Sequence, residues 1–148
     1  MDTLPNIDVQ ALIKFGDKIY TDWLVFGGNR SIHHHFFDDI FPFSAKIGKL
    51  PIQYVGIGRH RVTYLIVGTE IVLKFPLSVD GFFDNTHEAE VKGERYAECC
   101  MVGNSTILAM EFVDRIPYES LPGWAGFIDC GQVGKTKDGR IVAYDFGY

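Results

Sequence analysis

Apolar residues in the first part of the chain recur at helical spacing. Within residues 8–26, DVQALIKFGDKIYTDWLVF, the spaced apolar positions are Val9, Leu12, Ile13, Ile19, Trp23 and Phe26. This spacing predicts a helix, weakly interrupted at Gly16. Asp8 is its expected N-cap, since a short acidic side chain accepts hydrogen bonds from free first-turn amides. Gly27, Gly28 and Asn29 predict its end.

From Ile52 onward the pattern changes to short runs rich in Val, Ile, Tyr and Thr. Residues 52–76 hold three such runs separated by glycine-containing turns at 56–58 and 68–70, which predicts an antiparallel meander of three strands. Residues 85–102, NTHEAEVKGERYAECCMV, are predicted to form a helix capped by Asn85 or Thr86. Residues 105–114 are expected to form a further strand.

Residues 134–147, GKTKDGRIVAYDFG, predict a hairpin. Asp138 and Gly139 are a typical turn pair, and residues 140–144 would form the second strand.

The stretch 31–43, SIHHHFFDDIFPF, contains three consecutive histidines among aromatic residues. Consecutive side chains point in different directions on a helix or a strand, so His33, His34 and His35 cannot all face one metal without an irregular backbone. We expect a packed, aromatic-rich connector, with a metal site that includes Asp38 and Asp39 as the alternative. Residues 1–50 are therefore interpreted as a helical, aromatic-rich region, and residues 51–148 as a second unit.

Composition narrows the class of protein. The 148 residues are 47% hydrophobic and 22% charged, which is typical of a globular chain with a core. The net charge of -5 excludes a general basic field for nucleic acid or an anionic membrane surface. The three cysteines, Cys99, Cys100 and Cys130, are expected to be reduced thiols. With no signal-peptide pattern and no apolar run near the roughly 20 residues of a membrane span, we expect a cytoplasmic protein.

The order of the predicted elements and the ending AYDFGY suggest a family. Strand, glycine turn, strand, hairpin, strand, helix, strand is the order in the small lobe of protein kinases, and Asp-Phe-Gly resembles their metal-binding turn. Residues 53–147 therefore resemble a compressed protein-kinase-like domain. The resemblance implies an α+β fold with a kinase small-lobe-like antiparallel sheet, one packing helix and a rudimentary second lobe.

On this resemblance, the nucleotide would lie between a glycine turn and a hinge. Gly56 and Gly58 take the place of the glycine-rich loop, where the backbone approaches the phosphates, and Arg61 replaces the third glycine and adds positive charge. Residues 108–114, LAMEFVD, resemble the hinge that reads adenine, with Glu111 as a binding position. The plain alternative is a hairpin turn with solvated arginines.

Lys74 lies in the otherwise apolar run EIVLKFP. A buried ammonium needs a carboxylate or a phosphate beside it, and the resemblance makes Lys74 the lysine that holds the α and β phosphates. Its expected partner is Glu88, with Glu90 and Glu94 as the other candidates. An edge-strand lysine that points into water is the alternative.

The resemblance assigns metal and catalytic positions near the end of the chain. Asp145 of the Asp-Phe-Gly turn would hold Mg²⁺, and Gln132 stands where kinases have their second metal ligand, an asparagine. The position of the catalytic aspartate is taken by Phe127, which cannot accept a proton, so Asp129 is the candidate that replaces it. No His-Arg pair precedes Asp129, and the fifteen residues between Val113 and Asp129 are too few for the usual large-lobe helices.

Three functions are compatible with these residues. The first is a minimal ATP-dependent phosphotransferase that uses ATP and Mg²⁺. The second is an inactive pseudokinase-like module that binds and regulates or inhibits a partner protein. Small kinase-like proteins of this type are associated with bacteria and their phages, so a host protein or a second copy of the chain would be the partner. The third is an α+β domain in which Asp-Phe-Gly occurs by chance.

Overall fold

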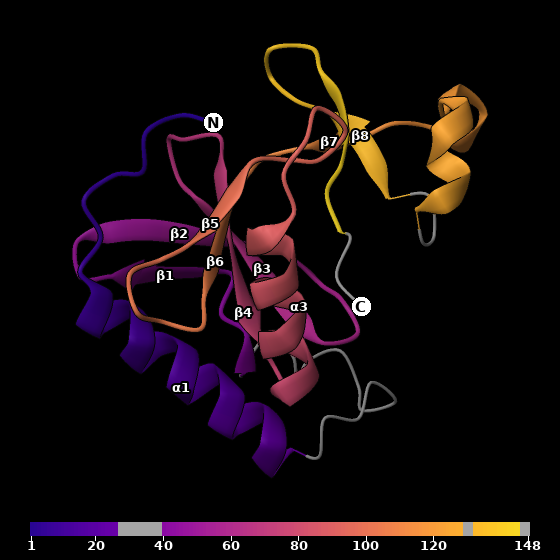
Figure 1. Ribbon diagram of the computed structural model, residues 1–148. Helices are drawn as coiled ribbons and strands as arrows, with labels where there is room; N and C mark the ends of the chain where they lie inside the picture. The colour runs from indigo at the N-terminus through magenta and orange to yellow at the C-terminus, as the bar shows by residue number, and fades with distance from the viewer. Residues whose placement is uncertain (27–39, 129–131, 146–148) are drawn as a thin grey trace.

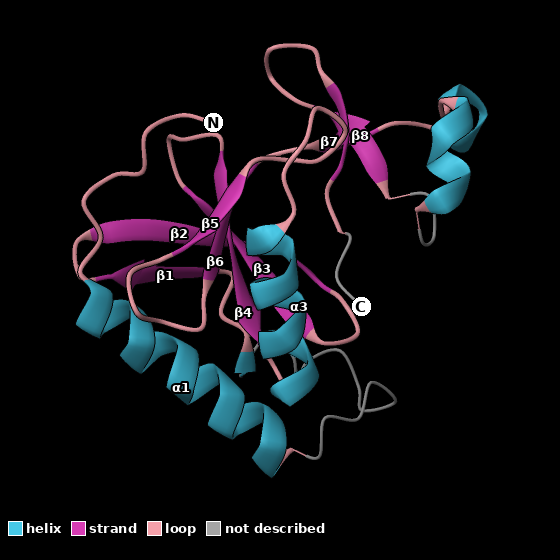
Figure 2. Ribbon diagram, viewed as in Figure 1, coloured by secondary structure: helices cyan, strands magenta, loops and turns pink. Residues whose placement is uncertain are grey.

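Two α-helices, two short 3-10 helices (Tyr118–Ser120 and Gly123–Phe127) and two antiparallel sheets are present in the part of the chain that the computed structural model describes, residues 1–26, 40–128 and 132–145. The larger sheet has six strands and the smaller has three (Figures 1 and 2). The predicted α+β class is confirmed. The elements are α1 (Val9–Val25), β1 (Ser44–Ile47), β2 (Leu50–Ile57), β3 (Arg61–Ile66), β4 (Ile71–Pro76), α3 (Val79–Glu90), β5 (Cys99–Met101), β6 (Leu108–Glu111), β7 (Asp114–Arg115), β8 (Val133–Lys135) and β9 (Ile141–Ala143).

The six-stranded sheet has the order β1-β2-β3-β4-β6-β5. Strands β2, β3 and β4 pair as the predicted antiparallel meander, and the second turn contains Gly68 as expected. The first turn comes two residues later than the predicted 56–58, because Gly56 and Ile57 are paired with β3. Strand β1 was not predicted, and it extends the sheet beyond β2. Strand β6 is a shortened version of the strand expected over 105–114, and it pairs on both sides, with β4 and β5.

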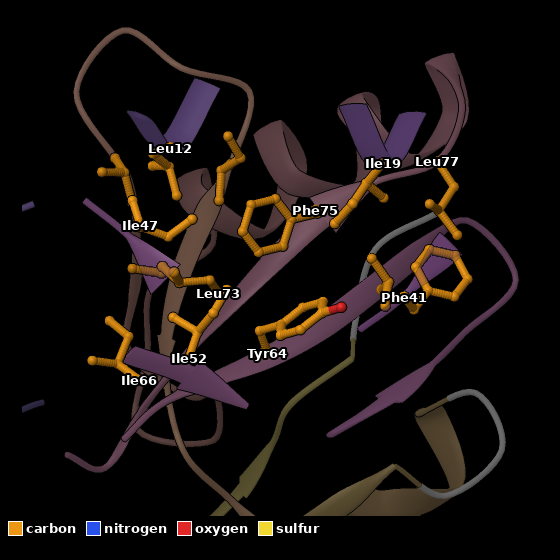
Figure 3. Packing of buried hydrophobic residues seen from close by; sticks show 14 of the residues in the cluster. Leu12, Ile19, Phe41, Ile47, Ile52, Tyr64, Ile66, Leu73, Phe75 and Leu77 are labelled. Atoms are coloured by element: carbon orange, nitrogen blue, oxygen red, sulfur yellow. The ribbon is translucent and has the colours of Figure 1, made fainter. Parts of the chain in front are cut away.

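Helix α1 is confirmed, and Asp8 caps it by accepting a hydrogen bond from the Ala11 amide at 3.1 Å. Its buried side chains, Leu12, Ile19 and Trp23, belong to one apolar cluster with residues of β2, β3 and β4. Figure 3 shows this core, with Tyr64, Leu73 and Phe75 of the sheet packed among the helix residues. Each large side chain buried here contributes about 1.5–3 kcal/mol to stability.

Strand β4 is buried along its whole length because both of its faces are covered. Leu73 and Phe75 face the cluster that contains α1. Val72 belongs to a second cluster, which contains Val142 of β9, and Lys74 reaches α3. Successive residues of a strand point to opposite faces, so Lys74 projects away from α1 and toward the second sheet.

The helix predicted over 85–102 is wrong in its bounds. Helix α3 runs from Val79 to Glu90, and Ser78 caps it by accepting from the Gly81 amide at 3.2 Å. Asn85 is therefore a fully buried residue within the helix rather than a cap. The end of the predicted helix is strand β5, because Cys99, Cys100 and Met101 satisfy their backbone groups by pairing with β6.

The hairpin predicted over 134–147 is present as β8 and β9, with Gly139 at the turn at a φ of +89°. The last residue of β9 is hydrogen-bonded to the segment after α3: the Ala97 amide donates to Ala143 O, and the Ala143 amide donates to Arg95 O. Figure 1 shows the small sheet beside the large one, with the chain after β9 returning toward α3. This path carries Tyr144 and Asp145 to Lys74.

Several sequence predictions fall outside the described residues: the helix end at Gly27, Gly28 and Asn29, the connector with His33, His34 and His35, its alternative metal site with Asp38 and Asp39, the candidate base Asp129, and the reduced thiol of Cys130. Of the connector, Ile40 and Phe41 are described, and both are buried in the main core. None of the described helices has the length and apolar character that crossing a membrane requires.

Candidate functional site

A buried ion pair joins Lys74 of β4 to Glu88 of α3. The Lys74 Nζ lies 2.9 Å from Glu88 Oε1, and the Glu88 side chain is 0% exposed. Glu88 is thus the partner of Lys74, while Glu90 and Glu94 are exposed. Lys74 also donates to the backbone oxygen of Tyr144 at 2.6 Å. Burial lowers the pKa of Lys74, and the nearby Glu88 carboxylate acts in the opposite direction.

Arg61, the first residue of β3, supplies a second buried cation at this place. Its guanidinium forms an ion pair with Glu88 Oε2 and donates to Asn85 Oδ1 at 3.1 Å. Through its other terminal nitrogen it donates to Asp145 Oδ1 at 2.5 Å. Glu88 Oε2 accepts no well-directed hydrogen bond from the described residues, so the charge of Arg61 is what stabilises it.

The structure therefore brings together Arg61, Lys74, Glu88 and Asp145, which the sequence had placed at four separate points of one proposed site. We call these four residues the charged cluster. They come from β3, β4, α3 and the segment after β9. Two cations and two carboxylates balance in formal charge, so the buried ions neutralise one another as burial requires.

Two further residues complete the surroundings of the charged cluster, and the sequence reading did not assign them to the site. Asn85 donates to Lys74 O at 3.0 Å and to Thr106 O at 2.8 Å while it accepts from Arg61. Asp84 is buried beside it, and burial raises the pKa of its carboxyl while Arg61 opposes that change. In the sequence, the only indication that Asn85 and Asp84 belong to the site was their spacing, three and four residues before Glu88, which places them on the same face of a helix.

The two predicted glycines lie at the end of β2 and just after it: Gly56 is within β2, where it pairs with Thr63 of β3 after a shift in register, and Gly58 begins the turn to β3. The Gly58 amide donates to Arg61 O at 2.8 Å. Among the described residues, a Cβ on Gly56 would meet nothing within 4 Å, and one on Gly58 would be in ordinary contact with Arg61 O at 3.6 Å. Neither residue has a positive φ. The backbone conformation and the described neighbours thus do not require glycine at either position.

The turn is anchored to the start of α3. His60 O accepts from the Leu77 amide at 2.8 Å, and a Cβ on Gly81 would lie 2.3 Å from the same oxygen. Only glycine allows this close approach. This contact between Gly81 and His60 holds the residue just before Arg61 in place. It therefore also helps to position the Arg61 guanidinium in the charged cluster.

Glu111, predicted as a binding position at the hinge, lies at the end of β6 with its side chain already engaged. Its Oε1 accepts from Arg140 at 2.5 Å and its Oε2 accepts from the Glu98 amide at 2.6 Å. The side chain is buried and ties the large sheet to the small one. Any contact of this segment with a ligand would therefore come from backbone groups.

Gln132 lies next to the charged cluster through its backbone, because its carbonyl accepts from the Tyr144 amide at 3.1 Å. The residues present do not fit a resident Mg²⁺ well. Asp145, the expected metal ligand, is paired with a guanidinium, and a divalent cation at its carboxylate would be placed beside another cation. Gln132 contributes a neutral amide, and Mg²⁺ prefers carboxylate and phosphate oxygens. Within the described residues, no group of three or more His, Cys, Asp or Glu side chains could hold a metal ion.

A mostly apolar hollow of about 380 Å³ lies elsewhere in the described chain. It is lined by α1, the start of α3 and the turn at 104–107. None of the predicted site residues lines it. The charged cluster, rather than this hollow, carries the chemical groups that could act on a ligand.

Cys99 borders the charged cluster and is expected to be unreactive. Its Sγ donates to Glu88 O at 3.1 Å, and burial raises the pKa of the thiol to about 11. The thiolate fraction at about pH 8 should then be about one hundredfold below that of an ordinary thiol. The folded state therefore holds the Cys99 proton more tightly than the unfolded state does. The protonated thiol should stabilise the folded state below about pH 9, and this stabilisation should be lost as the pH rises toward 11.

Iodoacetamide labelling followed by tandem mass spectrometry would check this expectation. Cys100, which is partly exposed, provides the internal comparison on the same peptide. Equal labelling of Cys99 and Cys100 in the native protein would contradict the burial of Cys99.

No family model matches the chain, and neither a curated protein nor a solved structure does so. The class that the fold defines is an α+β protein with a six-stranded and a three-stranded antiparallel sheet. Its activity must be inferred from the charged cluster itself.

Proposed function

We propose that this chain is a small protein-kinase-like domain that binds a nucleoside triphosphate at the charged cluster. The observation that carries the proposal is the buried Lys74–Glu88 ion pair, which joins the third strand of the meander to the helix that follows it. In the kinases that this chain resembles, the corresponding pair aims the ammonium at the phosphates.

The topology supports the same proposal. Without β1, the large sheet has the order β2-β3-β4-β6-β5, and α3 connects β4 to β5. This is the arrangement that the resemblance to a kinase small lobe implies. In this chain, α1 covers the sheet face opposite Lys74, as the separate clusters around Phe75 and Val142 indicate.

The segment after β6 supports a hinge that acts through its backbone. It leads directly into β7 of the small sheet, as a hinge between two lobes would. The Glu111 side chain is occupied by Arg140, and the Phe112 amide donates to Glu70 O at 2.7 Å. The adenine ring would therefore be recognised by the remaining main-chain groups of residues 112–114. The phosphotransferase expected from the sequence needs nucleotide binding, whereas the pseudokinase-like regulator needs only the fold and a partner. Transfer to an acceptor would further require a base, for which Asp129 is the candidate.

Replacing Lys74 by methionine should abolish nucleotide binding. At a ligand concentration about one hundred times Kd, binding stabilises a protein by about 2.7 kcal/mol, which would raise Tm by roughly 5–10 °C here. Differential scanning fluorimetry with ATP, measured with and without Mg²⁺, should show this shift for the wild type and not for Lys74→Met. Lys46→Met, which removes an exposed strand lysine, is the matched control and should keep the shift. No shift for the wild type at millimolar ATP under either condition would overturn the proposal.

Replacing Gly56 by alanine should separate ligand binding from folding. The new methyl group meets no atom of the described residues within 4 Å, so Tm without ligand should change by less than about 2 °C. If phosphates lie against this turn, the methyl group should weaken ATP binding by about tenfold or more. Isothermal titration calorimetry measures the effect, and unchanged affinity would show that the ligand does not approach Gly56.

A further inference from the structure

The Arg61–Asp145 contact joins a buried cation to a more exposed anion. The Arg61 side chain is 8% exposed, whereas that of Asp145 is 37% exposed. Arginine binds carboxylate and phosphate oxygens with the same planar set of donors. A phosphate arriving from solvent would therefore find its place on Arg61 already taken by the Asp145 carboxylate.

Arg61 would keep its position if Asp145 moved away. Its guanidinium is also held by Asn85 and Glu88, and Asn85 is itself fixed by two backbone carbonyls. Lys74 is held separately by Glu88 and by Tyr144 O. Displacing the one partly exposed carboxylate would thus leave two fixed cations, with Glu88 as their shared counter-ion.

We propose that Asp145 is an internal substitute for a ligand phosphate on Arg61, so that this domain takes its nucleoside triphosphate free of divalent cation. The proposal rests on the proposed function and specifies the form of its ligand. Arg61 supplies a positive charge beside the phosphates, where kinases use a metal ion. Asp145 then competes with the ligand instead of binding it through a metal.

The two roles of Asp145 predict opposite effects of one substitution. If Asp145 competes with phosphate, Asp145→Asn removes a negative charge from Arg61, and ATP in EDTA should bind at least threefold more tightly. If Asp145 is a metal ligand, the same change should weaken binding of ATP with Mg²⁺ at least tenfold. Asp17→Asn, the same change on an exposed residue of α1, is the matched control and should leave affinity unchanged.

Isothermal titration calorimetry with ATP in EDTA and with ATP in Mg²⁺ tests the proposal. We expect wild-type Kd values within threefold of each other under the two conditions. The affinity of Arg61→Gln for ATP in EDTA should be at least tenfold lower than that of the wild type, and Arg61→Lys should recover part of the lost affinity. If Arg61→Gln does not fold, as judged by circular dichroism, Asp145→Asn still decides the question because it changes a partly exposed residue.

The possible outcomes distinguish a failure of this proposal from a failure of the proposed function. Binding that requires Mg²⁺ and is abolished by Asp145→Asn would overturn the metal-free form of the site and leave nucleotide binding standing. Equal affinity of the wild type and Arg61→Gln in EDTA would also overturn it. Absence of binding under both conditions would remove the proposed function and this inference together.

Discussion

Replacing Glu88 by alanine should lower the free energy of unfolding by about 3–5 kcal/mol, because removing one partner of a buried ion pair leaves the other charge uncompensated. In this protein the effect concerns two cations, since Glu88 is the counter-ion of both Lys74 and Arg61. Among the described residues, Asp145 would then be the remaining carboxylate paired with Arg61, and Lys74 would keep only the Tyr144 carbonyl as its partner.

Urea denaturation followed by circular dichroism measures this loss. Glu88→Gln retains an acceptor of similar size but not the charge, so it should lose less stability than Glu88→Ala. Glu90→Ala removes an exposed carboxylate from the same helix and should change stability by less than about 0.5 kcal/mol. If Glu88→Ala proves as mild as Glu90→Ala, the charged cluster does not hold α3 to the sheet.

Replacing Gly81 by alanine should destabilise the protein, although alanine normally stabilises a helix interior by about 1 kcal/mol relative to glycine. The added Cβ would lie 2.3 Å from His60 O and 3.1 Å from the Cα of Pro76, and both are backbone atoms. Relieving these contacts requires the turn before Arg61 to move away from α3. A cost of about 1–3 kcal/mol is typical of such overpacking, with more where backbone must shift.

Gly16→Ala is the matched control for this prediction. It places the same methyl group inside α1, where the nearest atoms lie 3.4 Å away and belong to the side chains of Ile107 and Phe75. That substitution should be neutral or stabilising. The two variants should therefore shift the urea midpoint in opposite directions or, at the least, by clearly different amounts. A stabilised Gly81→Ala protein would mean that the turn and α3 are less closely packed than described.

Patterns that are local in sequence predicted the elements that the structure confirms. Helix α1, the meander of β2 to β4 and the hairpin of β8 and β9 each follow from spacing and turn residues that lie within one short segment. A lysine in an apolar strand needs an acidic or phosphate partner, and the resemblance to kinases indicated a glutamate of the following helix, with Glu88 as the first choice. The paired elements follow one another in the chain.

Helix α3 was misplaced because two signals in the sequence conflict. Ser78 and Asp80 are good helix-start residues, but Gly81 and the exposed Phe82 and Phe83 obscure an amphipathic pattern. The face of α3 that packs inward is polar, with Asp84, Asn85 and Glu88 buried. Hydrophobic periodicity cannot identify a helix that is held to its sheet by ions and amides.

The contacts of Arg61 could not be predicted at all. Asp145 lies 84 residues further along the chain, and the Arg61–Asp145 pairing depends on how the small sheet returns its last strand to the large one. Sequence reading placed Arg61 near a phosphate and Asp145 near a metal. It had no means to show that the folded chain places the two against each other.

The contact between Lys74 and the carbonyl of Tyr144 has a consequence for sequence variation. Every amino acid carries that oxygen, so the hydrogen bond depends on the path of the main chain after β9 and not on which side chain stands at position 144. Substitutions at position 144 would therefore report only on the packing of the tyrosine ring in the second apolar cluster. They would not remove the hydrogen bond that connects the end of the small sheet to the centre of the large one.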